Sequence, residues 1–238
     1  MFIKRAISRD IFNNVLKFTY FVDEHDVDHT DAFWKVRPLF DQTNSSAKRL
    51  VHQSEFVSVD ETMVRYFGPH PLKQAIREKP ERYGWKVWCL ATAEGELLAC
   101  QPYAGLKTKI KNNGLGQGPD VVLSLSEQYG LKKGTKVACD NLFTSFDLLD
   151  HMGEHGWGVV GTVRQNGLVG VPMPTKKQAK KEMTRGTMKS VYDNNNCVTI
   201  SMDSKAVVLA SNYNGPNPAG ILFHFKVLEF KKIKICLK

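Results

Sequence analysis

The chain has 238 residues, of which 42% are hydrophobic and 24% are charged, close to the averages of globular proteins. This composition excludes a collagen-like chain, a coiled coil and a wholly disordered protein. The 33 lysines and arginines outnumber the 24 aspartates and glutamates, so the formal net charge is +9. That charge favours a polyanionic partner such as DNA, and the alternative is that it only keeps the chain soluble.

The cysteines indicate a reducing compartment. Their number is odd and no two of them form a CxxC pair, which argues against a disulfide framework and a structural zinc site. They are Cys89, Cys100, Cys139, Cys197 and Cys236. No apolar run reaches the ~18 residues of a membrane span, and the start lacks the apolar segment of a signal peptide. We therefore expect a protein of the cytosol or nucleus without a membrane partner.

The first part of the chain, residues 1–50, is expected to form a small helical region. Ser8 is suited to cap a helix whose apolar positions are Ile11, Phe12, Val15 and Leu16. Five acidic residues follow, Asp23, Glu24, Asp26, Asp28 and Asp31. They lack the glycine and spacing of a calcium loop, so we expect a solvated loop, with cation binding as the alternative. A second apolar patch, which we expect to seal this region, consists of Trp34, Val36, Leu39 and Phe40.

From Phe56 the hydrophobic period changes from that of a helix to that of a strand. Val57, Val59 and Met63 alternate with polar residues, which predicts a strand whose Asp60 points away from the apolar face. The later elements are expected as strands 87–92 and 97–103, a helix from 118 to 130, a strand 136–140, a helix 145–156 and a strand 159–163. This β-β-β-α-β-α-β order predicts an α/β fold with a mixed sheet and flanking helices.

Residues 164–190 break this pattern and are strongly basic. Between residues 176 and 189, six cations oppose only Glu182, namely Lys176, Lys177, Lys180, Lys181, Arg185 and Lys189. The stretch is expected either to follow a DNA phosphate backbone or to be a solvated basic loop. A hairpin is then predicted from strands 197–202 and 206–210, which turn at Asp203 and Ser204.

Two carboxylates stand out as candidates for chemistry. Asp60 lies within a hydrophobic strand, and Asp140 ends another. If the two strands are neighbours, both carboxylates reach one edge of the sheet, where they could bind Mg²⁺ through oxygen. Two-metal phosphoryl transfer normally needs a third carboxylate. The alternative is a solvated strand end or a helix cap.

Residue identities around both aspartates resemble those of the piggyBac transposase family. The stretches 58–63 (SVDETM) and 139–145 (CDNLFTS) are similar to two of its signatures, and 79–88 (KPERYGWKVW) is similar to a third. Further matches lie at residues 33–39, 160–166 and 203–212. The resemblance extends from about residue 7 to 216, in the family's order and spacing.

The resemblance implies a ribonuclease-H-like fold and a triad of aspartates that binds two Mg²⁺ ions and cuts and rejoins DNA at TTAA targets. Asp60 falls on the first position of this triad and Asp140 on the second. The third aspartate, within a Gly-Val-Asp motif, is absent, and Asp193 and Asp203 are not expected to replace it. The family's cysteine-rich end is also absent, and the start looks clipped relative to the family.

These features divide the chain into three parts. Residues 1–50 are the helical part, 51–216 an incomplete ribonuclease-H-like DDE transposase domain, and 217–238 a divergent basic and apolar tail. Two functions stay open: a truncated, catalytically incomplete transposase-derived protein, and a non-catalytic DNA- or protein-binding module of the same origin. An inert product is a third possibility. The expected cofactor is weakly bound Mg²⁺, and the expected partner is DNA. The chain is further expected to form a homodimer and to be located in the nucleus.

Overall fold

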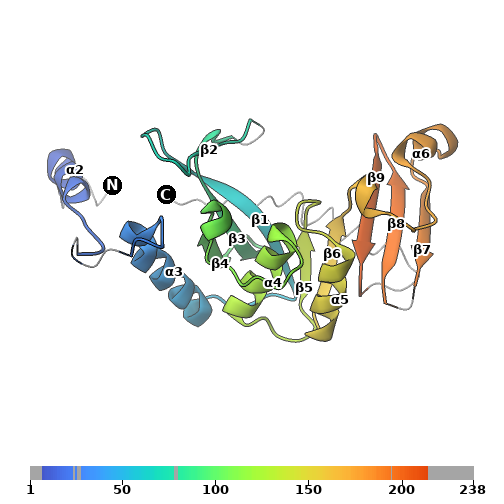
Figure 1. The fold of residues 1–238 in the computed structure, drawn as a ribbon, viewed down its shortest axis with the longest axis horizontal. Helices are drawn as coiled ribbons and strands as arrows, with labels where there is room; N and C mark the ends of the chain where they lie inside the picture. The colour runs from blue at the N-terminus through green and yellow to red at the C-terminus, as the bar shows by residue number, and fades with distance from the viewer. Residues whose placement is uncertain (1–6, 24, 26–27, 78–79, 194, 214–238) are drawn as a thin grey trace.

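The structure, a computed structural model, describes residues 7–23, 25, 28–77, 80–193 and 195–213 (Figure 1). The predicted tail, 217–238, lies outside these residues, as do Glu24, Asp26 and Lys79. Within the described part, no helix is both long enough and apolar enough to cross a membrane.

A nine-stranded mixed sheet forms the centre of the described chain. Its strands are β1 (Phe56–Arg65), β2 (Gln74–Ala75), β3 (Tyr83–Thr92), β4 (Leu97–Pro102), β5 (Lys136–Cys139), β6 (Gly158–Thr162), β7 (Met188–Tyr192), β8 (Cys197–Met202) and β9 (Ala206–Ser211). They lie in the order β2-β3-β1-β5-β6-β9-β8-β7, and β4 also pairs with β3. β1, β5 and β6 are parallel to one another, whereas the pairings of β2, β3, β4, β7, β8 and β9 are antiparallel.

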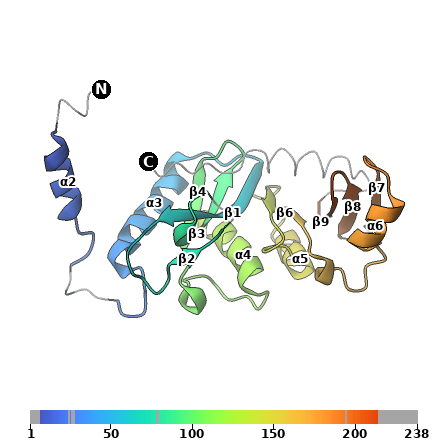
Figure 2. The ribbon, with the colours of Figure 1, turned by 90° about the horizontal axis from the view of Figure 1, so that it is seen from above.

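The α-helices are α2 (Arg9–Lys17), α3 (Arg37–Leu50), α4 (Gln117–Tyr129), α5 (Phe146–Glu154) and α6 (Lys176–Glu182). Single 3-10 turns, η1, η2 and η3, occupy Trp34–Val36, Gly105–Lys107 and Gln165–Gly167. α4 and α5 cover the same face of the sheet, and α3 lies beside β4 (Figure 2).

The predicted β-β-β-α-β-α-β order is confirmed by β1, β3, β4, α4, β5, α5 and β6, with the short β2 inserted after β1. α4 ends where Gly130 adopts the left-handed conformation (φ 82°), as the position of this glycine predicts. The largest core cluster lies between this helix layer and the sheet. It includes Val57, Val59, Val121, Leu125, Val137, Leu148, Leu149 and Met152, each at most 2% exposed. The predicted α/β fold with a mixed sheet is therefore confirmed.

The N-terminal region differs from the prediction. Ser8 does cap α2, because its side chain accepts a hydrogen bond from the Ile11 N–H at 3.3 Å. However, α2 has no buried residue, and the predicted seal is wrong: Leu39 is exposed, and α3 packs on β4 instead. Asn44 explains this docking, since its side-chain amide accepts from the Cys100 N–H (2.8 Å) and donates to the Cys100 carbonyl (3.0 Å).

The acidic loop also differs from the expected solvated loop at one position. Asp31 is only 2% exposed, and its carboxylate is bound by the Arg37 side chain (2.5 Å) and by Lys109 (3.2 Å). Lys109 also contacts Asp28 at 3.2 Å. The side chains of Arg37 and Lys109 thus pair with carboxylates that a bound metal cation would need. The same ion pairs connect the helical region to the sheet domain.

The basic stretch contains more regular structure than its pattern suggests. Residues 164–190, for which a solvated basic loop was one of the two expectations, contain the helix α6 and the start of the strand β7. Thr175 and Gln178 form a reciprocal capping box at the start of α6, and Ala179 is the helix's one buried residue. The predicted hairpin of β8 and β9 is confirmed, and β7 adds a third antiparallel strand to it.

Candidate active site

The sheet register places Asp60 and Asp140 side by side. β1 runs parallel to β5, with Val57 opposite Val137 and Val59 opposite Cys139. Asp60 follows Val59 in β1, and Asp140 follows Cys139 at the end of β5. Neighbouring strands of a sheet lie about 4.8 Å apart. β1 and β5 are therefore neighbours, the condition under which the sequence placed both carboxylates at one part of the sheet.

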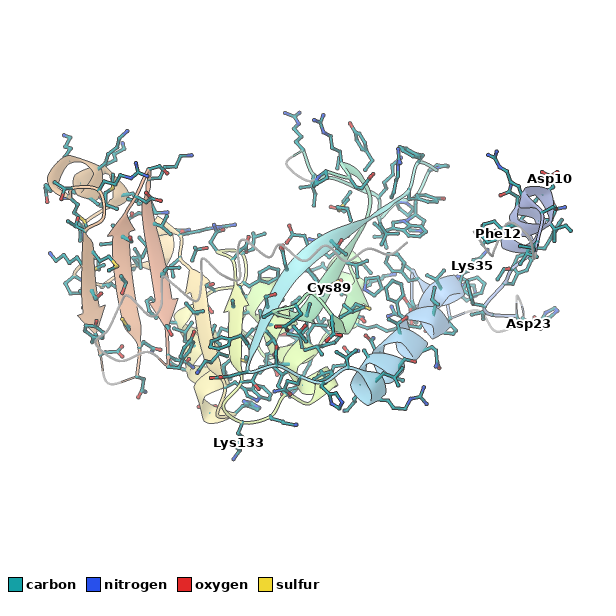
Figure 3. All side chains as sticks on the ribbon, turned by 180° about the vertical axis from the view of Figure 1, so that it is seen from behind. Asp10, Phe12, Asp23, Lys35, Cys89 and Lys133 are labelled. Carbon is teal, nitrogen blue, oxygen red and sulfur yellow. The ribbon has the colours of Figure 1, made fainter. Side chains whose placement is uncertain are left out.

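Asp60 lies inside β1 and is held between two strands. It pairs with Cys89 of β3 on its other side; Cys89 is labelled in Figure 3. Val57 and Val59 are buried, whereas Asp60 is half-buried, as expected from its alternate position in the strand. The Glu61 backbone N–H donates to the Asp60 carboxylate at 2.8 Å. A rigid central strand thus fixes where this carboxylate lies.

Asp140 begins a tight turn that connects β5 to α5. The Leu142 N–H donates to its carboxylate at 2.7 Å, and the Thr144 hydroxyl donates to its backbone carbonyl at 2.8 Å. Ser145 then caps α5, since its side chain accepts from the Leu148 N–H at 3.2 Å. The short turn leaves Asp140 little freedom and keeps it half-buried at the carboxyl end of β5.

Two glycines allow this turn to pack closely. A Cβ atom on Gly118, in the first turn of α4, would lie 2.0 Å from the Leu142 carbonyl oxygen. A Cβ atom on Gly161 of β6 would lie 2.0 Å from the Thr144 hydroxyl oxygen. Both positions therefore require glycine, and we assign them a positioning role for the turn that carries Asp140. Neither was predicted from the sequence, because a glycine in a helix or strand carries no sign of what approaches it.

A cation beside the Asp140 turn, and a half-buried cation on the other face of the sheet, were also not predicted from the sequence. The Arg164 guanidinium donates to the Asn141 side chain at 3.0 Å, which brings a cation next to the Asp140 turn. On the face of the sheet opposite to Asp60, the Lys86 ammonium of β3 lies 3.9 Å from the centre of the Tyr103 ring and 5.0 Å from that of Trp88. Burial lowers the pKa of Lys86, and the nearby Glu61 carboxylate raises it in part. The sequence held one signal for the Glu61–Lys86 interaction. The alternation of β1 puts Glu61 on the same face of the strand as Val57.

The oxygen ligands of this site are of the kind that a hard divalent cation prefers, but there are few of them. Asp60 and Asp140 offer carboxylate oxygens, the ligands that Mg²⁺ prefers. Within the described part of the chain, no three His, Cys, Asp or Glu side chains gather in a group that could hold a metal ion. Asp193 and Asp203 lie elsewhere: Asp193 accepts backbone N–H bonds in the β7–β8 turn, and Asp203 pairs with Arg185 at 3.0 Å. A metal here would thus have two carboxylate ligands and water.

The predicted basic surface lies on α6. Lys176, Lys177, Lys180 and Lys181 are all exposed, on a helix whose buried side is Ala179. Arg185 is 78% exposed but is paired with Asp203. α6 follows β6 through η3, and β6 is parallel to β5, so α6 lies toward the edge of the sheet at which Asp140 lies (Figure 1).

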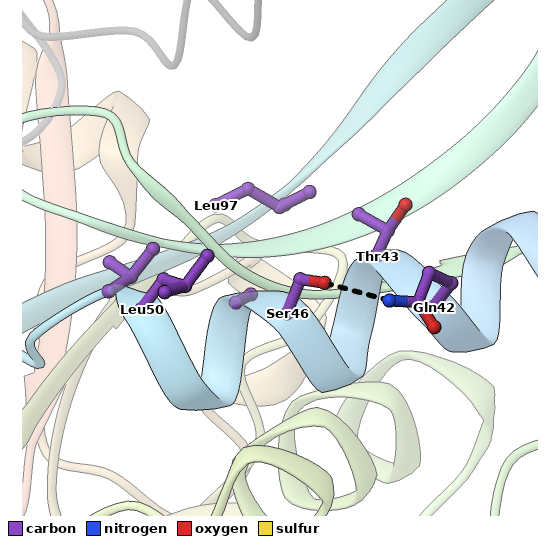
Figure 4. Close-up of a pocket in the computed structure, with 7 residues that line it drawn as sticks. Gln42, Thr43, Ser46, Leu50 and Leu97 are labelled. Carbon is purple, nitrogen blue, oxygen red and sulfur yellow. Dashed lines mark hydrogen bonds between the residues drawn. The ribbon is translucent and has the colours of Figure 1, made fainter.

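A shallow apolar cavity of about 420 Å³ lies between α3 and β4 (Figure 4). Its walls are Gln42, Thr43, Ser46, Ala47, Leu50, Val51 and Leu97. Gln42 donates to the Ser46 hydroxyl at 3.2 Å, and none of the lining side chains is titratable. The cavity therefore offers neither an acid, a base nor a metal ligand, and the two aspartates remain the better candidate for chemistry.

The strand order β4-β3-β1-β5-β6, with one carboxylate within β1 and one directly after the parallel strand β5, is the arrangement of a ribonuclease-H-like domain. The chain belongs to the transposase family described as Transposase IS4, whose model matches residues 1–231. The match runs past residue 216, where the recognisable motifs end. It confirms the resemblance to transposases.

The more specific similarity is to piggyBac proteins. The human piggyBac transposable element-derived protein 3 is 34% identical over 242 residues, which is 98% of this chain and 40% of that protein. The human piggyBac transposable element-derived protein 2 is 32% identical over 219 residues, 90% of this chain and 36% of that protein. The chain thus spans about two fifths of the length of these relatives.

A solved structure confirms the fold. It is a cryo-EM structure of a piggyBac transposase synaptic complex with hairpin DNA, which matches with a TM-score of 0.79 at 22% identity. The match covers 94% of this chain and 48% of that one. The predicted ribonuclease-H-like architecture is therefore confirmed.

Proposed function

We propose that this chain is the DNA-binding, ribonuclease-H-like part of a transposase-type protein, in which Asp60 and Asp140 hold Mg²⁺ beside the DNA backbone. The observation that carries the proposal is the parallel register of β1 and β5, which sets the two carboxylates next to each other. A carboxylate pair of this kind on adjacent strands suits a cation that also binds phosphate oxygens.

The charge distribution supports DNA as the partner. The lysines of α6 and the carboxylates belong to the same edge of the sheet, so a duplex held by the lysines passes near the aspartates. Lysine neutralises phosphates and releases counterions, which gives binding that weakens steeply with salt. The similar piggyBac transposase was solved in a synaptic complex with hairpin DNA, which is further support.

The chain's own residues would contribute position and charge. Asp60 and Asp140 would bind the ion, while the backbone N–H groups of Glu61 and Leu142 keep the two carboxylates oriented. The ion, when bound, would supply Lewis-acid stabilisation of charge on a phosphate oxygen. We further propose TTAA-containing DNA as the preferred duplex, a homodimer as the assembly and the nucleus as the location, by analogy with the family.

A non-catalytic DNA- or protein-binding module is the second candidate function. The specific observation that favours it is the gathering of only two carboxylates among the described residues, fewer than two-metal catalysis normally uses. A supercoiled-plasmid assay with Mg²⁺ separates the two. Nicking that is abolished in Asp60→Asn supports a catalytic function, and DNA binding without nicking supports the module.

The test of DNA binding uses fluorescence anisotropy with a short labelled duplex at several salt concentrations. We expect the double variant Lys176→Gln with Lys177→Gln to lower the slope of log K against log salt by about 0.9 for each phosphate that the protein no longer neutralises. The matched control is Lys132→Gln with Lys133→Gln, which removes the same charge from the loop before β5, at the opposite edge of the sheet. Equal effects of the two double variants would contradict the placement of DNA along α6.

The test of metal binding uses Mn²⁺, followed by its electron paramagnetic resonance signal, as a probe for the hard-cation site. Asp60→Asn and Asp140→Asn should each weaken Mn²⁺ binding, because each removes one of the two carboxylates. Asp147→Asn, an exposed position in the first turn of α5, is the control and should leave binding unchanged. Retention of wild-type Mn²⁺ affinity in both site variants would refute the metal assignment. A duplex with TTAA and one with the same bases permuted test the sequence preference.

A further inference from the structure

A projecting segment between β1 and β3 carries exposed aromatic and basic side chains that the proposed function does not use. We call residues 66–82 the arm; it includes β2 and is described except at 78–79. It rises above the edge of the sheet, and side chains extend from it into solvent (Figures 1 and 3). β2 pairs with the start of β3, Gln74 opposite Gly84, which folds the arm back on itself.

The base of the arm is rigid because its aromatic rings pack on one another. Tyr66 stacks on Trp85 with ring centres 4.4 Å apart and planes at 19°. His70 meets the Trp85 ring edge to face at 5.4 Å, and Phe33 does so at 5.7 Å. The Lys73 ammonium also donates to the Gly68 carbonyl at 3.1 Å, which closes the first turn of the arm. Tyr66, His70 and the first turn of the arm are therefore held against the sheet by defined contacts.

Phe67 stands outside this cluster. Its side chain is 69% exposed although its neighbour Tyr66 is packed, so the folded arm does not need its ring. The Arg65 guanidinium carbon lies 4.8 Å from the centre of the Phe67 ring, and Arg65 also pairs with Glu81 at 3.4 Å. The ring and the guanidinium thus form an oriented, solvent-facing pair. The other exposed cations of the arm are Lys73, Arg77 and Arg82.

We propose that Phe67 and Arg65 form a stacking platform for an unpaired base of the nucleic acid. An exposed aromatic ring offers a flat π-face on which any base can stack, and arginine adds a cation–π contribution and charge for the adjacent phosphate. The surrounding cations then hold the sugar–phosphate backbone on either side. The inference rests on the proposed function, since it assumes that nucleic acid is the partner. It adds that the arm recognises an unpaired base of that nucleic acid.

The position of the arm is consistent with this role. β1 continues from Asp60 to Arg65 before the arm begins, about 17 Å at the rise of a strand. That distance corresponds to about five nucleotide steps along one strand of DNA. A strand whose phosphate lies at the two aspartates would therefore present a base at Phe67 a few nucleotides away, on the same edge of the sheet as α6.

The experiment compares the full chain and its Phe67→Ala variant on two probes. One is a short blunt DNA duplex, and the other is the same duplex with a single-stranded extension of a few nucleotides. We expect the wild-type chain to bind the extended duplex more tightly. Phe67→Ala should lose this preference, about fivefold or more for one stacked base, and bind the blunt duplex as the wild type does. Phe67→Trp should restore the preference because it restores a ring.

Phe21→Ala is the matched control, since Phe21 is also an exposed phenylalanine (49%) but lies in the N-terminal region. It should bind both probes like the wild type. Circular dichroism and thermal unfolding of Phe67→Ala should match those of the wild type, because the ring makes no part of the aromatic cluster. A loss of fold in this variant would itself contradict the inference.

The outcomes separate the inference from the proposed function. If the wild type binds neither probe, the proposed function fails, and the inference fails with it. If the wild type binds the blunt duplex but gains nothing from the extension, DNA binding stands and the stacking platform is refuted. The same conclusion follows if Phe67→Ala keeps the full preference for the extended duplex.

Discussion

Substitution of Gly118 by alanine tests whether close packing of α4 on the Asp140 turn holds the candidate site in place. The new methyl group would lie 2.0 Å from the Leu142 carbonyl oxygen, whereas an ordinary carbon–oxygen contact is about 3.3 Å. The helix or the turn must therefore move by about 1.3 Å. Overpacking of this kind costs about 1–3 kcal/mol, and alanine recovers about 0.5–1 kcal/mol by its helix preference. We expect a net loss of about 1–2 kcal/mol in the free energy of unfolding.

Urea unfolding followed by circular dichroism measures the loss, and Mn²⁺ binding reports whether Asp140 has moved. Gly153→Ala in the last turn of α5 is the control, because its methyl group would lie 3.4 Å from the Asn212 side-chain amide, an ordinary contact. This variant should be unchanged or more stable by about 0.5 kcal/mol. If Gly118→Ala is as stable as Gly153→Ala and binds Mn²⁺ with wild-type affinity, the packing argument is wrong.

Three further substitutions test contacts elsewhere in the structure. Burial alone would raise the pKa of Asp31, but hydrogen bonds from Arg37 and its charge outweigh this and hold the pKa at about 2, against an ordinary 3.8. This depressed pKa contributes about 2 kcal/mol to the free energy of unfolding, which is present above pH 4 and lost as the pH falls from 4 to 2. In urea unfolding, Asp31→Asn should therefore make the free energy of unfolding less dependent on pH in this range. Asn44→Ala leaves the backbone groups of Cys100 without their amide partner, and we expect a loss of about 1–3 kcal/mol and faster hydrogen exchange at that amide. Burial raises the pKa of the Cys139 thiol to about 12 from an ordinary 9, so stability should fall by about 1.4 kcal/mol per pH unit between these values, and Cys139→Ala should remove that slope.

The central sheet was predictable because its strands carry their own signals. β1 alternates apolar and polar residues, and β5 is a short apolar run, so period and length identify both. α4 has a proline in its first turn and Gly130 at its end, which fix its boundaries. The adjacency of Asp60 and Asp140 was not fixed by these signals, because it depends on β5 pairing with β1 across the sheet.

The basic segment was not predictable in the same way, because little of it is buried. α6 contributes only Ala179 to the core, so its sequence shows no apolar stripe, and its capping box was the remaining signal. β7 faces solvent at Met188 and Lys189 and shows no strict alternation. Tertiary pairing with β8 decides its conformation, and a sequence pattern does not contain that information.

The same limit applies to Asp31 and the arm. Burial of Asp31 depends on Arg37 and on Lys109, which is far along the chain, so a local pattern of acidic residues indicates only a solvated loop. The aromatic cluster of the arm joins Phe33 to Trp85, again across a long separation. Such contacts become visible only when the fold brings the partners together.

The pairing of Asn44 with the backbone of Cys100 also determines where the sheet can grow. The bare edge of a sheet is a template for another strand, and one side-chain amide here supplies both partners that an incoming strand would otherwise provide at this point of β4. At the other side of the sheet, β7 pairs only with β8 within the described chain. β7 is therefore a terminal strand of the sheet within the described chain, and its exposed Lys189 disfavours the addition of a strand from a second basic copy.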